Sequence, residues 1–132
     1  MPELPEVETI KRGLSKFILH QKLTVVTVFC EKSFIGQPIT GEVVGLRRFG
    51  KALVIDFAGG KSMMIHLRMT GQLIFQGEER FAAGHPSENF VADLPNKQTR
   101  VVFEFENGKL FFNDQRKFGF CKVMKTSEGE QE

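Results

Sequence analysis

Near the start of the chain, apolar residues recur at intervals of three and four positions: Val7, Ile10, Leu14 and Phe17. This spacing places them on one face of an α-helix that extends roughly to Leu19. Pro5 suits the first turn of such a helix, where its missing N–H costs nothing, and Glu6 and Glu8 suit the positive end of the helix dipole. The pattern predicts one amphipathic N-terminal helix.

Beyond this helix the pattern changes to short runs of β-branched and aromatic residues, which are typical of strands. The runs are LTVVTVF (23–29), EVVGLRR (42–48), KALVIDF (51–57), KSMMIHL (61–67), QLIF (72–75) and GFCKVMK (119–125). Residues 100–114, RVVFEFENGKLFFND, add a hairpin in which Asn107 and Gly108 are expected to form a type I′ turn. We therefore expect a mainly β fold with a flanking helix (α+β), a two-layer β-sandwich or flattened barrel of about eight strands.

Two segments carry neither pattern. Residues 77–96, GEERFAAGHPSENFVADLPN, are polar and irregular and predict a long surface loop. The last seven residues, TSEGEQE, are acidic and without periodicity, which is typical of a domain boundary. We expect residues 1–132 to form one domain of a longer protein.

Composition supports a globular protein that works inside the cell. The 132 residues are 41% hydrophobic and 26% charged, and most of the 14 Phe are expected in the core. No apolar run approaches the roughly 20 residues of a membrane helix, and the N-terminus lacks signal-peptide features, so we expect a cytoplasmic protein without membrane contact. Cys30 and Cys121 are too few for a zinc site and lie in apolar runs, which favours buried free thiols over a disulfide.

The charge distribution says more than the net charge of +2. The segment TSEGEQE holds three glutamates and no cation, so removing its charge of −3 leaves +5 on the remainder. The cations gather in two clusters: Arg47, Arg48 and Lys51, then Arg116 and Lys117. Solvated turns explain such clusters, and so does a surface that binds phosphates.

The opening MPELPEVE offers unusual chemistry. A proline exposed by removal of Met1 is a secondary amine, and its attack on a sugar carbon gives an iminium that is charged without protonation. Glu3 is then placed to move protons at the sugar, and Glu6 to hold the geometry of the amine. The alternative is ordinary helix-start chemistry, because Pro and Glu are both favoured in a first turn.

Four motifs in order along the chain decide between these interpretations: MPELPEVETIKRGL, RRFGKAL, HLRMTGQL and NDQRKFG. Together they resemble the N-terminal domain of bacterial formamidopyrimidine-DNA glycosylase, and they cover nearly the whole chain from residue 2 to residue 119. The resemblance implies a base-excision repair enzyme that removes oxidised purines, chiefly 8-oxoguanine and formamidopyrimidines, and then nicks the strand by β,δ-elimination. The implied partner is double-stranded DNA containing oxidised bases, bound by a monomer.

The resemblance also assigns catalytic roles. Pro2 is similar to the nucleophile that forms a Schiff base at C1′, Glu3 to the general acid and base, and Glu6 to the supporting carboxylate. Lys51 in RRFGKAL matches a lysine that contacts the phosphate beside the lesion.

Further residues are implied in DNA binding. Met69 matches a methionine that fills the void left by the flipped nucleotide, Arg116 an arginine that hydrogen-bonds the orphaned cytosine, and Phe118 a wedge between base pairs. Gln98, in KQTR where the family usually has KHDH, replaces a DNA-contacting histidine, and Arg100 is expected to compensate. Additional phosphate attraction is expected from three basic residues: Arg47, Arg48 and Lys117.

The chain departs from the family in what it lacks. The family continues with a helix–two-turn–helix domain and a four-cysteine zinc finger, and neither is present here. We therefore expect no cofactor in this chain, zinc in the missing C-terminal domain, and weak DNA binding with little or no cleavage by these 132 residues alone.

Two alternatives share the fold. A glycosylase of the endonuclease VIII type acts on oxidised pyrimidines, but its opening usually has glycine where this chain has Leu4, and it lacks the arrangement of Met69 and Phe118. A non-catalytic relative that binds damaged DNA would need neither Pro2 nor Glu3, so their presence argues against it.

Overall fold

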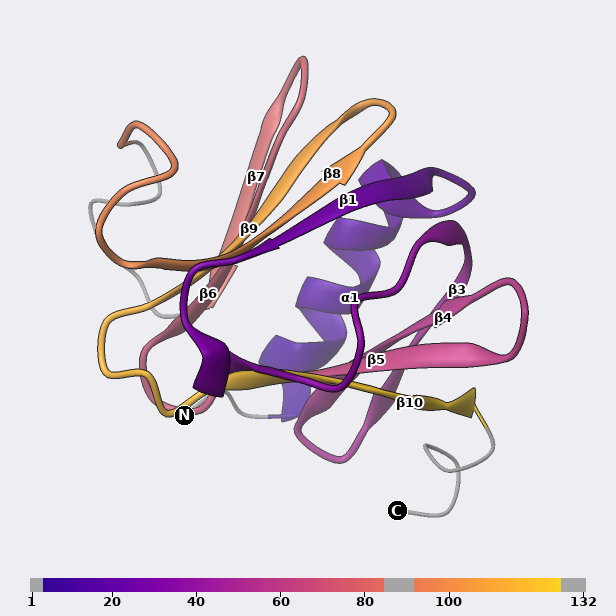
Figure 1. Cartoon of the computed structure of the whole chain (residues 1–132), viewed down its shortest axis with the longest axis horizontal. Coiled ribbons are helices and arrows are strands. Elements are labelled where there is room, and N and C mark those ends of the chain that lie inside the picture. The colour runs from indigo at the N-terminus through magenta and orange to yellow at the C-terminus, as the bar shows by residue number, and fades with distance from the viewer. Residues whose placement is uncertain (1–3, 85–91, 127–132) are drawn as a thin grey trace.

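The structure, a computed structural model, describes residues 4–84 and 92–126 (Figure 1). Helix α1 spans Leu4–Ile18, close to the predicted bounds. Its inward side chains are fully or almost fully buried: Val7, Ile10, Leu14 and Ile18. After the helix, His20 adopts a left-handed conformation (φ 68°) and its N–H donates to the carbonyl of Val43, which turns the chain into the sheet.

Among the described residues, ten strands follow, and they form one continuous sheet in the order β2-β10-β5-β4-β3-β1-β8-β9-β6-β7. Their bounds are β1 (Lys22–Val28), β2 (Phe34–Ile35), β3 (Gly41–Phe49), β4 (Ala52–Phe57), β5 (Lys61–His66), β6 (Gly71–Gln76), β7 (Arg80–Gly84), β8 (Thr99–Phe105), β9 (Gly108–Asp114) and β10 (Phe120–Lys125). A short 3₁₀ helix, Glu31–Ser33, precedes β2. The pairs are antiparallel except β2 with β10.

The sheet folds into two layers where β1 meets β3. Strands β1 and β3 share only two residue pairs, Lys22 with Glu42 and Leu23 with Gly41, so the two halves splay apart there (Figure 1). The buried side chains between the halves form the main core, to which α1 contributes one face. The predicted mainly β class with an N-terminal helix is confirmed, and β2 and β7 are the strands beyond the eight expected.

The prediction of a loop throughout residues 77–96 was wrong for its first part. Residues 80–84 form strand β7, which pairs along its whole length with β6. On its other side β7 meets the helix: the Phe81 ring stacks on Phe17, with centroids 5.8 Å apart, and a Cβ on Gly13 would lie 2.3 Å from the Phe81 ring. Contacts with distant residues therefore stabilise a strand that has little alternation of its own.

The predicted hairpin is confirmed, but its turn is not of type I′. Phe105 pairs with Gly108, so Glu106 and Asn107 form the turn, and neither has a positive φ. Gly108 serves close packing instead, because a Cβ there would lie 2.5 Å from the carbonyl oxygen of Gln76. The side chain of Asn107 donates to the carbonyl of Phe17, 2.7 Å away, and ties the hairpin to the end of α1.

Both cysteines are free thiols, as predicted, but only Cys121 is buried, whereas the expected burial of Cys30 was wrong because its side chain is partly exposed. Within the described part of the chain, no helix combines the length and the apolar character that crossing a membrane requires.

Candidate nucleic-acid interface

The predicted site residues that the structure describes lie at one end of the sandwich. The strand register requires this: Phe120 pairs with His66, Gly71 with Asp114, and Leu53 with Ile65. The turns between β3 and β4, β5 and β6, and β9 and β10 therefore emerge together. They carry the predicted residues Lys51, Met69, Arg116 and Phe118.

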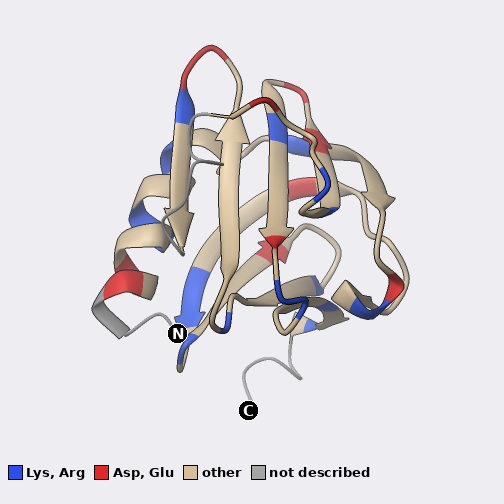
Figure 2. Cartoon of the chain, turned by 90° about the vertical axis from the view of Figure 1, so that its left-hand side faces the viewer, with Lys and Arg blue, Asp and Glu red and all other residues tan. Residues whose placement is uncertain are grey.

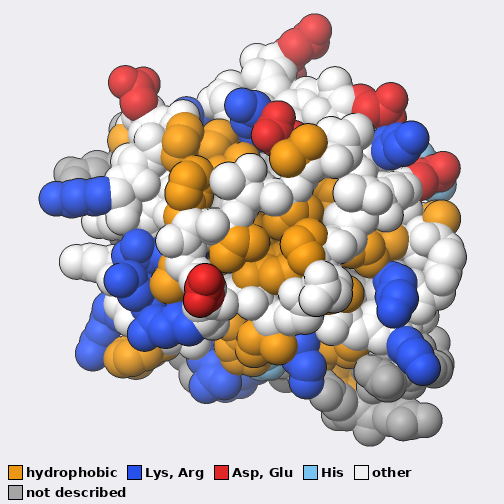
Figure 3. Space-filling view, viewed as in Figure 1, with side chains coloured by type: hydrophobic (Ala, Val, Ile, Leu, Met, Phe, Trp, Pro, Cys, Tyr) orange, Lys and Arg blue, Asp and Glu red, His pale blue; other side chains and the backbone are white. Residues whose placement is uncertain are grey.

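Met69 and Phe118 are exposed although both are large and apolar. Each side chain is 51% exposed, and neither belongs to a buried cluster. The guanidinium of Arg116 lies over the Phe118 ring, with its carbon 4.9 Å from the ring centre. Figure 3 shows Lys and Arg side chains gathered at the lower left of this face, with hydrophobic side chains among them, where β9 leads into β10 in Figure 1.

A buried carboxylate connects the two turns. Asp114 is 0% exposed, and its two oxygens accept hydrogen bonds from the Thr70 hydroxyl and from the N–H of Gly119 (2.6 Å). The same Thr70 hydroxyl accepts a hydrogen bond from the N–H of Arg116 at 3.1 Å. The turn of Met69 and the turn of Arg116 are thus joined through two side chains.

The segment that contains Gln98 and Arg100 is hydrogen-bonded to the backbone of Asp114. The N–H of Asp114 donates to the carbonyl of Gln98 (3.0 Å), and Nε of Arg100 donates to the carbonyl of Asp114 (2.8 Å). Nη1 of Arg100 also donates to the carbonyl of Lys97, at 3.2 Å. Arg100 therefore has a structural role, and its expected compensation for the missing histidine stays a prediction.

Lys51 lies exposed on the turn between β3 and β4, beside Gly50 in the left-handed conformation (φ 60°). Arg48 supports this turn, because its Nη1 donates to the carbonyl of Gly50 at 3.0 Å and its Nε lies 3.8 Å from the carboxylate of Glu8. Hydrogen bonds, first from Lys11 and then from Arg12, lower the pKa of Glu8 below its usual value. The contact between Arg48 and Glu8 keeps the turn between β3 and β4 close to helix α1.

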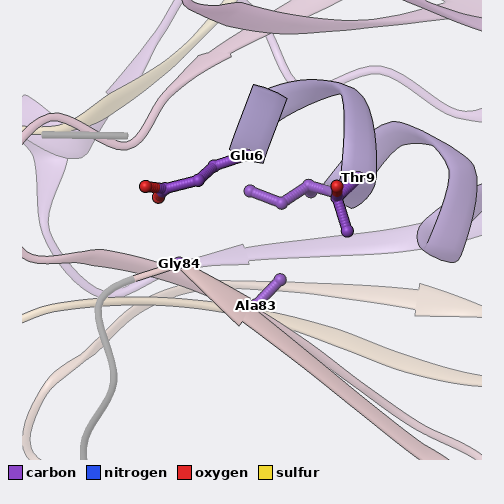
Figure 4. A pocket seen from close by; sticks show the side chains of 5 residues that line it. Glu6, Thr9, Ala83 and Gly84 are labelled. Carbon is purple, nitrogen blue, oxygen red and sulfur yellow. The ribbon is translucent and has the colours of Figure 1, made fainter. Parts of the chain in front are cut away.

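Glu6 faces a pocket of about 300 Å³ between the first turns of α1 and the end of β7 (Figure 4). Its other lining residues are Thr9, Ile10, Ala83 and Gly84. Gly84, with a φ of 104°, contributes no side chain to the wall of this pocket. A Cβ there would lie 2.4 Å from the carbonyl oxygen of Gly71, next to the Met69 turn. Pro2 and Glu3, the predicted nucleophile and acid–base group, lie outside the described residues.

The sequence profile of the formamidopyrimidine-DNA glycosylase N-terminal domain matches residues 1–121. The chain belongs to this family.

Curated relatives named formamidopyrimidine-DNA glycosylase agree. The protein of Cereibacter sphaeroides is 34% identical over 140 residues, covering 98% of this chain and 47% of the relative. That of Carboxydothermus hydrogenoformans is 38% identical over 127 residues, covering 90% and 43%. The chain thus spans a little under half the length of these relatives.

Solved structures of Lactococcus lactis Fpg share the fold, with a TM-score of 0.81 at 26% identity. A complex of an Fpg mutant with DNA containing Fapy-dG is covered over 98% of this chain and 46% of that one. A complex of the wild-type protein with DNA containing an oxidised pyrimidine is covered over 98% and 47%.

Within this Fpg-family domain, the expected phosphate attraction by Arg47 is corrected. Arg47 forms a two-point ion pair with Asp56, with Nε–Oδ2 at 2.9 Å and Nη2–Oδ1 at 3.2 Å. Its charge is therefore balanced within the fold. Figure 2 shows Lys and Arg on turns at the lower end of the sheet, and Glu on turns at the upper end.

Three residues at this end were missed by the sequence analysis. Thr70 and Asp114 stand inside the motifs HLRMTGQL and NDQRKFG, and the available signal was a polar residue next to Met69 and another two positions before Arg116. Phe29 is 59% exposed and lines a pocket of about 310 Å³ with Lys97 and Arg100. No local pattern distinguishes Phe29 from the core phenylalanines.

No group of three or more His, Cys, Asp or Glu residues in the described ranges is arranged to hold a metal ion.

Proposed function

We propose that this chain is the N-terminal catalytic domain of a bifunctional DNA glycosylase and DNA-(apurinic or apyrimidinic site) lyase. The substrate would be double-stranded DNA containing oxidised purines such as 8-oxoguanine and formamidopyrimidine. The observation that carries the proposal is the exposure of Met69, Arg116 and Phe118 on adjoining turns, at the same end as the Glu6 pocket. Insertion into DNA explains why two large apolar side chains are kept out of the core.

The three side chains have the properties needed to stabilise DNA from which one nucleotide has been flipped out. Extrusion of the damaged nucleotide costs a few kcal/mol of stacking and pairing and leaves a void in the duplex. The flexible, polarizable side chain of Met69 would fill that void. Phe118 would wedge between base pairs and kink the duplex, while Arg116 has hydrogen-bond donors for the base left unpaired.

The Glu6 pocket supports the proposed chemistry at the sugar. With Met1 removed, the Pro2 nitrogen would attack C1′, and the bond from C1′ to the base would break with its electron pair leaving on the base. Opening of the sugar ring gives an iminium between Pro2 and C1′. Successive losses of the 3′ and 5′ phosphates, as the β- and δ-eliminations, then follow proton removal from the sugar, with Glu3 carrying the protons and Glu6 positioning the amine.

Preference for purines over pyrimidines rests on the presence of Leu4, Met69 and Phe118. The L. lactis complexes include DNA with either kind of lesion, so a direct comparison is needed. We expect faster cleavage of duplexes with 8-oxoguanine than with thymine glycol by the full-length protein. The reverse order would favour the endonuclease VIII type.

The test of the enzymatic assignment is borohydride trapping. The full-length protein, with intact mass confirming loss of Met1, is incubated with an 8-oxoguanine duplex and sodium borohydride, and the covalent adduct is measured on a denaturing gel. Wild type should trap and Pro2→Gly should not. Absence of an adduct from the wild-type protein would instead favour a non-catalytic protein that binds damaged DNA.

The 132 residues alone are expected to bind DNA weakly, as a monomer, and to nick little or nothing. The remaining part of the family's DNA-binding surface, with its zinc, would be supplied by residues outside this chain.

A further inference from the structure

Two turns cross from one layer of the sandwich to the other, and they lie side by side. Residues 67–70 join β5 to β6, and residues 115–119 join β9 to β10. Because β5 pairs with β10 and β6 with β9, the two crossings lie next to each other at the same end of the sandwich. Each crossing presents one exposed apolar side chain, Met69 or Phe118.

A chain of hydrogen bonds links the crossings. The N–H of Arg116 donates to the Thr70 hydroxyl, which donates in turn to one oxygen of Asp114. The other oxygen of Asp114 accepts the N–H of Gly119, so both oxygens of this fully buried carboxylate are used. The Thr70 hydroxyl accepts one hydrogen bond and donates another, both with the segment that leaves β9, and a buried carboxylate is costly unless such donors satisfy it.

The backbones of the crossings also touch. A Cβ on Gly119 would lie 2.6 Å from the carbonyl oxygen of His66 and 3.0 Å from that of Leu67, where the other crossing begins. Arg68 and Lys117, one in each crossing, hold the left-handed conformation with φ of 56° and 60°. Neither crossing can shift without breaking these contacts.

We infer that Thr70 and Asp114 are a positioning pair that locks the two crossings together, so that Met69, Arg116 and Phe118 meet DNA as one preformed unit. Neither Thr70 nor Asp114 needs to touch DNA for this. The inference rests on the proposed function of the three exposed side chains. Preorganisation reduces the ordering cost that three independent side chains would each add on binding.

The pair predicts that one partly buried hydroxyl, that of Thr70, controls the conformation of both turns. Thr70→Val keeps the shape of the side chain but removes its hydrogen bonds, and Thr70→Ser restores them. Thr24→Val is the matched control, because the Thr24 hydroxyl also donates a hydrogen bond, to the carbonyl of Glu104, but lies on β1, outside both crossings. Asp114→Asn provides a second test that retains the shape of the carboxylate.

The experiment measures amide exchange and methyl NMR of the 132-residue chain, then anisotropy of binding to duplexes with and without a tetrahydrofuran abasic analogue. In Thr70→Val and Asp114→Asn we expect exchange of the Arg116 and Gly119 amides to accelerate about tenfold or more, since their hydrogen bonds to the Thr70 hydroxyl and the Asp114 carboxylate are lost or weakened. The Met69 methyl and Phe118 ring signals should shift together. Preference for the abasic duplex should fall several-fold, with binding to the intact duplex unchanged.

Thr70→Ser and Thr24→Val should match wild type in all three readouts. Unchanged exchange and unchanged Met69 and Phe118 signals in Thr70→Val would overturn the positioning pair. If these signals change while Met69→Ala and Phe118→Ala leave the preference for the abasic duplex intact, the proposed DNA-filling function fails, and the role of the pair in DNA binding fails with it. The NMR and binding readouts thus separate the two failures.

Discussion

The guanidinium carbon of Arg116 lies 4.9 Å from the centre of the Phe118 ring, across the left-handed residue Lys117. A cation over a ring face is attracted to it and restricts its motion. Two residues predicted to contact DNA separately therefore support each other before DNA is present.

This stacking predicts coupled effects on binding to a duplex with an abasic site opposite cytosine. Arg116→Ala should cost about 1–3 kcal/mol, the usual range for loss of a base contact. In a double-mutant cycle with Phe118→Ala, the combined loss should fall short of the sum by about 0.5–1 kcal/mol, because each single change already disturbs the other residue. Strict additivity by fluorescence anisotropy would contradict the coupling.

The exposed position of Lys51 leads to a different prediction, about how DNA binding depends on damage and on salt. As a phosphate contact on an exposed turn, it should contribute to all duplexes alike. Lys51→Ala should weaken binding to damaged and intact DNA by the same factor and reduce the slope of log K against log salt by about 1. Lys109→Ala, a change of another exposed lysine in the hairpin of β8 and β9, should leave the slope unaltered. A loss confined to damaged DNA would argue against a phosphate contact.

The ion pair of Arg47 and Asp56 predicts a contribution to stability. The carboxylate of Asp56 also accepts the Ser62 hydroxyl at 2.5 Å, and the side chain is only 19% exposed. Asp56→Ala should lower the free energy of unfolding by about 2 kcal/mol, since two partly buried donors lose their partner. Arg12→Ala removes an ion pair with Glu8 in which Arg12 is 77% exposed, and it should cost under about 0.5 kcal/mol in the same urea titration. Equal effects of the two changes would show that burial of the pair is unimportant.

Gly119 predicts a strict size limit at the interface. In Gly119→Ala the new Cβ would meet backbone oxygen 2.6 Å away, so the crossing of β9 to β10 must shift and the midpoint of thermal unfolding should fall. Gly45→Ala is the matched control in a strand, because its φ is not positive and its nearest neighbour is an Asp56 oxygen at 3.9 Å. That change should be neutral or slightly stabilising, since alanine restricts the unfolded chain. A tolerated Gly119→Ala would contradict the close backbone contact.

The two thiols predict unequal reactivity. Burial raises the pKa of Cys121, whereas for Cys30 the opposing effect of partial burial is outweighed by hydrogen bonds from Ser33 and Lys32, which lower its pKa. Because the thiolate is the reactive form, Cys30 should be alkylated by iodoacetamide in the folded protein, and its rate should level off at a lower pH than that of a peptide cysteine. Cys121 should react only on unfolding. Equal rates for both thiols, measured by peptide mass spectrometry, would contradict this.

Local information in the sequence was sufficient for the helix and for most strands. The spacing of Val7, Ile10 and Leu14 identifies a buried helical face in any context, and the strand runs carry their own β preference. The motifs singled out Met69, Arg116 and Phe118, which the structure shows exposed on adjoining turns, while their roles in DNA binding stay predictions. The candidate DNA-binding residues could thus be named from the sequence alone.

Pairing between distant residues decided the rest. Strand β7 exists because β6 and Phe17 are there to pack against it, and Gly108 serves the backbone of β6 instead of a type I′ turn. Arg47 became a structural residue through Asp56 on the neighbouring strand. Thr70 and Asp114 are 44 residues apart and meet because β6 pairs with β9, which sets Gly71 opposite Asp114, and hydrogen bonds of this kind depend on atomic positions that no local pattern encodes.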